Sequence, residues 1–174
     1  MKYSSLVLLA CLCMTTPCLS EPERFTSDRP SPLKPAKPAK EPDAAVRFLG
    51  QVQISGWFRL KWRIIDEKRG HLFARFFPDQ ESIGLLPYPA GGARVEELLF
   101  SNSEEAASIL LEPATARRIR AKDLLDVEGA ATVTIRDYRI VVECDHRWYL
   151  AQLVSASHVQ TQVAGVRERR SVEC

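Results

Sequence analysis

The chain has 174 residues, enough for one domain with a sizeable core. Its apolar share of 45% is ordinary for a globular protein. The formal charge of +2 is too small to indicate a polyanionic partner.

The first twenty residues have the layout of a secretory signal peptide. Lys2 supplies a positive start, an apolar run of nine residues covers 6–14, and Pro17 follows. Cys18 and Ser20 are small residues at positions −3 and −1 of a cut after Ser20. Because the apolar run is too short to span a bilayer, we expect cleavage and export. The signal style and small size indicate the periplasm or outer membrane of a bacterium.

A lipoprotein signal is the main alternative for the same segment. Residues 8–11 (LLAC) form an imperfect lipobox, which would place a lipid anchor on Cys11. A cytoplasmic protein with an accidentally apolar start is the remaining alternative. Outside this segment the sequence contains no stretch that would span a membrane.

Cleavage after Ser20 would leave two of the five cysteines, Cys144 and Cys174. An even pair in an oxidising compartment predicts a disulfide between them. Closing a loop of that size would stabilise the fold by about 3 to 4 kcal/mol in the chain-entropy model. Two unpaired thiols are the alternative. A redox role is disfavoured because the sequence has no CxxC motif.

Residues 21–44 are predicted to be a disordered linker. Six of the eleven prolines lie in this segment, and its KPAKPAKEP stretch favours an extended polyproline II spacer. Phe25 and Leu33 are its only large apolar side chains, so we expect it to contribute no core. The β-rich domain is expected over 45–160, and an exposed C-terminal tail over 161–174.

The longest period-2 pattern in the chain covers 46–65 and predicts two strands, or one long strand bent at Ser55-Gly56. A turn over 66–70 and a strand over 71–77 follow. A short strand is predicted over 82–86, a loop over 87–92 and a strand over 95–100.

Ser101 and Glu104 have the spacing of a capping box and predict a helix with an apolar face over 106–111. Pro113 would end this helix or start a second helical segment over 114–124. Strands are then expected over 131–135, 139–144 and 148–154, with Arg136-Asp137 as a turn. The chain is therefore predicted to be mostly β with one or two helices. The element order resembles a small, OB-like, partly open five-stranded barrel with a helix between strands 3 and 4, and a sheet with one packed helix is the alternative.

Aromatic and cationic side chains alternate on the opening strand. Trp57, Arg59, Lys61 and Arg63 share one face, and this pattern suits binding of a partner along the strand. The simpler interpretation is a solvated face whose cations keep an exposed strand from pairing with another chain. Tyr88, between two prolines, is a second candidate as a rigid aromatic anchor. Its alternative is a side chain that folds back over the end of a barrel.

The sequence shows no motif of an established chemistry. Its three histidines are not spaced as metal ligands, so neither a metal site nor a cofactor is predicted. Its carboxylates fit turns and helix starts, where solvation or the helix dipole explains them.

These observations favour an exported, non-enzymatic interaction domain that binds an envelope protein or a cell-wall component, as an inhibitor, an immunity-type protein or an assembly factor would. One alternative is a small cell-wall hydrolase that uses carboxylates. The other is an OB-like binder of single-stranded nucleic acid, which export makes less suitable.

Overall fold

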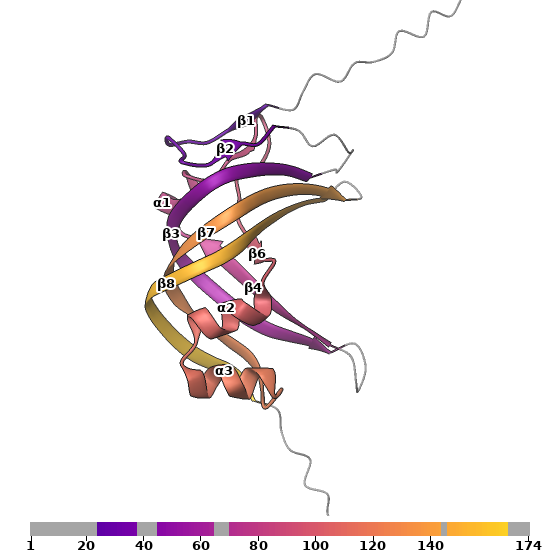
Figure 1. Cartoon of the computed structure of the whole chain (residues 1–174), viewed down its shortest axis with the longest axis vertical. Coiled ribbons are helices and arrows are strands. Elements are labelled where there is room, and N and C mark those ends of the chain that lie inside the picture. The colour runs from indigo at the N-terminus through magenta and orange to yellow at the C-terminus, as the bar shows by residue number, and fades with distance from the viewer. Residues whose placement is uncertain (1–23, 38–44, 65–69, 144–145, 167–174) are drawn as a thin grey trace, which may run out of the picture.

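The computed structural model describes residues 24–37, 45–64, 70–143 and 146–166. Long strands dominate this part of the chain, with short helices beside them, so the predicted mostly-β class is confirmed (Figure 1). The predicted signal peptide, Cys144 and Cys174 lie outside the described residues. The elements in chain order are β1 (Phe25–Thr26), β2 (Lys34–Pro35), β3 (Ala45–Ile64), β4 (Gly70–Pro78), α1 (Gln80–Ile83), β5 (Tyr88–Pro89), β6 (Leu98–Phe100), α2 (Ser103–Leu110), α3 (Pro113–Arg120), β7 (Leu124–Glu143) and β8 (His146–Val166).

The main sheet has six strands and is partly ring-like. Its order is β2-β3-β4-β6-β8-β7. An additional pairing of β3 with β7 brings the last strand of this order back beside the second. Neighbouring strands in this sheet are antiparallel, apart from the parallel pair β6–β8. Helix α2 contacts both β4 and β8, whereas α3 contacts α2 and β7. Among the described residues, no helix is long and apolar enough to cross a membrane.

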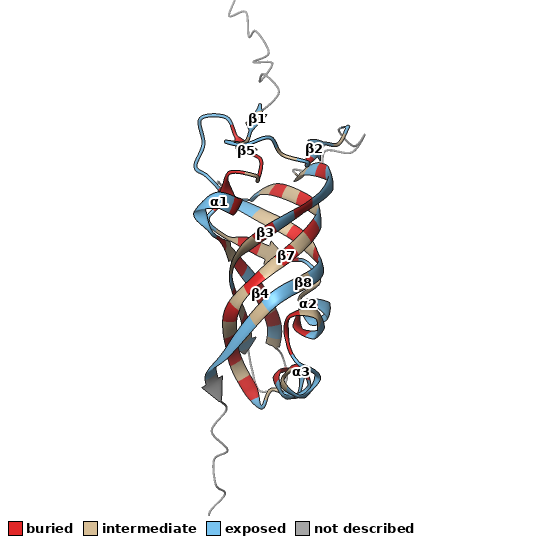
Figure 2. Ribbon diagram, turned by 90° about the vertical axis from the view of Figure 1, so that its left-hand side faces the viewer, coloured by how far each residue is buried: buried red, intermediate tan, exposed pale blue. Residues whose placement is uncertain are grey.

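Period-2 patterning places one face of each long strand inside the sheet. Val52, Ile54, Phe58 and Leu60 of β3 are buried, while Arg59 and its alternate neighbours face outward. Strands β4 and β7 alternate in the same way, and Figure 2 shows the resulting bands of buried and exposed residues. The helices add buried side chains from one face of each: Ala106, Ala107 and Leu110 of α2, and Ala116 and Ile119 of α3.

Strand β3 runs as one continuous element through Ser55 and Gly56. Its positive φ angle of 111° occurs earlier, at Gly50, beside a register shift between Phe48 and Gln51 against β7. A glycine accommodates that backbone conformation without the steric cost that a side chain would bring. The segment is thus one long strand rather than two, and its register irregularity against β7 lies at Gly50.

The predicted strand over 82–86 is wrong, because the chain forms helix α1 there. The carboxylate of Asp79 accepts a hydrogen bond from the Ser82 backbone N–H at 2.8 Å and caps this short helix. Its Ser82 hydroxyl in turn accepts a hydrogen bond from the backbone N–H of Ser55, at 2.8 Å. Helix α1 therefore links the end of β4 to the middle of β3.

Two other local predictions are also wrong. The N-cap of α2 is Asn102, without a side-chain capping bond, so Ser101 and Glu104 form no capping box. The amide of Asn102 instead bonds the backbone of Leu153. The expected turn at Arg136-Asp137 is part of β7, which continues through Asp137 at a φ angle of 49° beside a register shift against β8. Asp137 therefore forms a bulge instead of a turn, because β7 continues to pair on both sides of it.

Residues 24–37 contradict the prediction of an unfolded linker. Strand β2 pairs with β3, and β1 pairs with β5. Leu33 is only 2% exposed, and the ring of Phe25 meets Phe48 edge-on at 5.5 Å between centroids. These two apolar side chains cover one end of the main sheet and, with the strand pairings, attach the segment to it. The predicted exposed tail also differs, since β8 continues as far as Val166.

Candidate partner-binding face

Cations and aromatic rings gather on the outward face of β3 and β4. The register places them opposite one another in rows across the two strands. We call this set the basic aromatic face; its cross-strand pairs are Trp57–Phe77, Arg59–Arg75, Lys61–Phe73 and Arg63–His71. Four of its eight positions are Lys or Arg, so it combines positive charge with ring surfaces.

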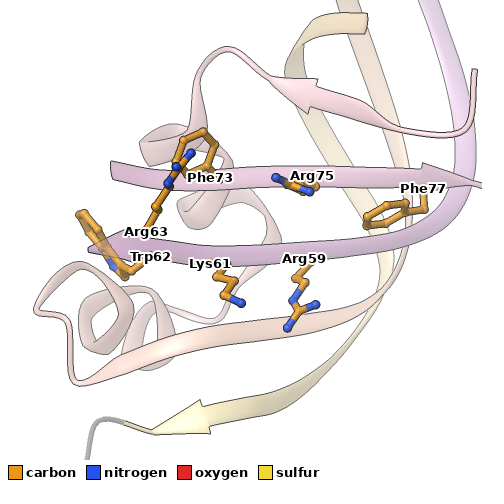
Figure 3. A pocket seen from close by; sticks show the side chains of 7 residues that line it. All are labelled: Arg59, Lys61, Trp62, Arg63, Phe73, Arg75 and Phe77. Carbon is orange, nitrogen blue, oxygen red and sulfur yellow. The ribbon is translucent and has the colours of Figure 1, made fainter. Parts of the chain in front are cut away.

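A concavity of about 520 Å³ lies on this face (Figure 3). It has no carboxylate among its lining residues, which are Arg59, Lys61, Trp62, Arg63, Phe73, Arg75 and Phe77. Figure 3 shows that these side chains come from two neighbouring strands. An anionic group entering the concavity would meet several cationic donors on one surface, and the carboxylates that pair with two of them lie outside its lining.

Asp126 of β7 holds Arg59 in place. Both Nε and Nη2 of the guanidinium donate to the carboxylate, with Nε 2.9 Å from Oδ1, and Lys61 Nζ lies 4.0 Å from Oδ2. The carboxylate is largely buried. The hydrogen bond that Arg59 donates to Asp126, together with the negative charge of Asp126, raises the pKa of Arg59 above its ordinary value. Arg59 therefore stays positively charged. Because Asp126 binds one edge of the guanidinium group, the remaining N–H groups of Arg59 keep a fixed orientation.

Arg75 lies directly opposite Arg59, where two like charges would normally repel. Each has its own carboxylate, however. Arg75 Nη1 lies 3.4 Å from Glu97 Oε1, while Arg59 bonds Asp126. The acids thus lie on the neighbouring strand or loop at either side, and the cations occupy the middle. This arrangement permits two arginines side by side.

The two tryptophans of β3 differ in environment. Trp57 is 41% exposed on the basic aromatic face, next to Phe77. Trp62 lines one end of the concavity and is fixed by α3, since its indole N–H donates to the Ile119 carbonyl at 2.6 Å and Lys122 Nζ lies 5.0 Å from its ring centroid. Trp57 is the more exposed of the two rings, but it lies outside the lining of the concavity.

Tyr88 belongs to a different part of the molecule. It is half-buried, and its hydroxyl donates to the Asp28 carboxylate at 2.7 Å. That hydrogen bond raises the pKa of Tyr88. Arg94 also pairs with Asp28, with 2.9 Å from Nε to Oδ2. Tyr88 thus ties β5 to the N-terminal segment, as the folded-back alternative predicted, and does not line the concavity on the basic aromatic face.

Sequence reasoning located half of this face. Trp57, Arg59, Lys61 and Arg63 do lie together, as their period-2 spacing indicated. It missed the β4 half, Phe73, Arg75 and Phe77, although the alternation was visible in HLFARFF. The missing information was the cross-strand register, which depends on residues of the intervening connection rather than on either strand.

No protein-family model matches the sequence, and no match was found among curated proteins or solved structures. Within the described residues there is also no cluster of three or more His, Cys, Asp or Glu that would hold a metal ion.

Proposed function

We propose that this chain is an exported, non-enzymatic interaction domain that binds an acidic partner protein of the cell envelope through its basic aromatic face. The observation that carries the proposal is the concavity that gathers four cations and two phenylalanine rings with no carboxylate in its lining. Such a surface offers charge complementarity for orientation and ring surfaces for contact area. The export signal expected in the first twenty residues supports the location.

We further propose that the domain is an OB-like barrel. In its favour, the order β3-β4-β6-β8-β7 with the added β3–β7 pairing has a parallel pair next to the helices, and α2 and α3 follow β6 in the chain and precede β7. OB barrels bind ligands on the face of their second and third strands. The corresponding strands here are β4 and β6, so the basic aromatic face on β3 and β4 shares one strand with that surface.

The test is capture of envelope proteins by the intact chain and by a charge-reversed variant. Lys61→Glu with Arg63→Glu reverses two exposed cations of the face and leaves Arg59 and Asp126 themselves unchanged, although it removes the Lys61 ammonium that lies 4.0 Å from the Asp126 carboxylate. We expect the captured protein to be acidic. The Kd should weaken by about a hundredfold, since the variant disrupts two charge pairs and each costs about 1.4 kcal/mol, or tenfold.

Arg24→Glu with Lys34→Glu is the matched control, because it makes the same charge change on the N-terminal segment, away from the concavity (Figure 1). The control should bind as the native chain does. Equal weakening by both variants would show nonspecific charge attraction and contradict the proposal. Turnover of cell-wall polymer by the purified chain would contradict its non-enzymatic part.

Single-stranded nucleic acid is the second candidate ligand. The specific observation in its favour is the Trp57–Phe77 pair beside Arg59 and Arg75, because rings next to cations stack bases and contact phosphates. An oligothymidylate in place of the protein partner tests it. Quenching of tryptophan fluorescence that falls steeply with added salt would favour this candidate over an acidic protein.

A further inference from the structure

The C-terminal half of β8 has a free edge. Strand β8 pairs with β6 at Leu150 and Ala151 only, whereas its pairing with β7 continues to Val166. Among the described residues, no strand pairs with residues 154–166 on the side away from β7. Figure 2 shows this half of β8 in the colour of exposed residues.

Asn102 occupies the edge of β8 just beyond the residues that pair with β6. Its side-chain amide accepts a hydrogen bond from the Leu153 N–H at 3.0 Å and donates to the Leu153 carbonyl at 2.9 Å. A single amide side chain thus supplies the two bonds that a neighbouring strand would supply. Beyond Leu153, side chains from 154 to 164 are exposed except at Ala156 and Val159, which are half-buried.

The sequence of this edge lacks the usual protection against pairing. Residues 154–164 (VSASHVQTQVA) include no Lys, Arg, Asp, Glu or Pro. Natural edge strands carry such residues to prevent association with another chain. The bulge at His158, whose φ angle is 52°, protects the inner end only. The stretch 159–163 beyond it is open, uncharged and already in strand conformation.

We propose that this edge pairs with the same edge of a second copy of the chain, antiparallel, to form a two-fold dimer. Residues 154–164 carry no Lys, Arg, Asp or Glu that would select a foreign strand by its charge. Two identical uncharged edges, by contrast, meet without repulsion, and Gln160, Thr161 and Gln162 hydrogen-bond their like across the axis. The dimer leaves the β3–β4 concavity of each copy unoccupied, so it would present two binding faces to one partner.

Sedimentation velocity on the chain isolated from cells that express the full sequence tests the dimer. Between about 1 and 100 µM, we expect a monomer–dimer equilibrium. Gln160→Lys with Gln162→Lys places like charges across the axis and should raise the dimer Kd by about tenfold or more. Gln160→Glu with Gln162→Glu should do the same, and mixing the two variants should restore association as a heterodimer.

Restoration on mixing also shows that both variants are folded. Gln53→Lys with Gln80→Lys is the matched control, since both residues are exposed and lie on β3 and α1, away from the edge; its dimer Kd should equal the native value. Lys61→Glu with Arg63→Glu should also leave it unchanged, which separates this inference from the proposed function. A native chain that stays monomeric up to about 100 µM would overturn the inference. So would a dimer that the Gln160 and Gln162 variants do not weaken.

Discussion

Tyr138 shows how one buried polar group links the core to pH. Its side chain is fully buried, and its hydroxyl donates to the Pro87 carbonyl at 2.7 Å. The ring lies 5.4 Å from Phe48 and is stacked on Tyr149, with 6.4 Å between centroids. Burial raises the pKa of Tyr138 well above the ordinary tyrosine value, because ionised phenolate would have no water around it.

The raised pKa predicts a loss of stability in alkali. The neutral phenol is favoured in the fold, so its contribution is complete below the unfolded pKa of about 10 and is lost as pH rises above that value. Tyr138→Phe should reduce the free energy of unfolding by about 1 to 2 kcal/mol at pH 7, since the Pro87 carbonyl loses its donor. The variant's decline above about pH 10 should be shallower than that of the native chain.

Urea unfolding at pH 7 and at several values above 9 measures both effects. Tyr88→Phe is the control, because the Tyr88 hydroxyl meets a carboxylate near the surface rather than a core carbonyl. Most of the alkaline decline should persist in that control. An unchanged alkaline slope in the Tyr138 variant would show that another group controls it.

Among the elements, β7 and β8 approach one another closely at Gly129. A methyl group added there would lie 1.9 Å from the Gln160 carbonyl oxygen and 3.0 Å from the Phe58 ring. A backbone oxygen cannot rotate away as a side chain would, so the strands would have to separate. Gly129→Ala should therefore lower the free energy of unfolding by about 3 kcal/mol.

The same denaturation measurement on Thr161→Ala is the comparison. Thr161 is the direct cross-strand partner of Gly129 and is exposed. Removing its atoms creates no overlap, so the change should stay below about 1 kcal/mol. Equal losses in the two variants would show that strand propensity, rather than close approach, explains the glycine.

Strand patterning in the sequence was informative where one face is buried along the whole element. It predicted β3 and β4, and it placed Trp57, Arg59, Lys61 and Arg63 together. It failed at Asp137, because a turn-favouring residue adopts a bulge when long-range pairing continues on both sides. It also failed for the end of β8, where exposure on both faces removes the alternation that a strand prediction needs. The free edge was invisible for the same reason.

At the scale of the whole molecule, the N-terminal segment and the basic aromatic face lie at different ends of the sheet. Residues 24–37 cover the end near β5, whereas the concavity lies where β3 and β4 pair (Figure 1). Composition alone assigned the segment to a spacer because prolines dominate it. Phe25 and Leu33 nevertheless bind the segment to the fold, since they pack on apolar residues at this end of the sheet.

Leu33 decides whether this segment is part of the fold. It is 2% exposed, and the Cβ of a side chain at Gly50 would lie 2.7 Å from the neighbouring Pro32 carbonyl oxygen, so the segment lies tightly against β3. Leu33→Ala should lower the free energy of unfolding by about 2 to 4 kcal/mol through reduced burial and the cavity left behind. Leu49→Ala, at a position 65% exposed on β3, makes the same chemical change and should stay within about 0.5 kcal/mol of the native value. Denaturant unfolding of both variants measures the difference. A Leu33 variant as stable as the Leu49 variant would show that the segment contributes little to the fold and acts as a spacer.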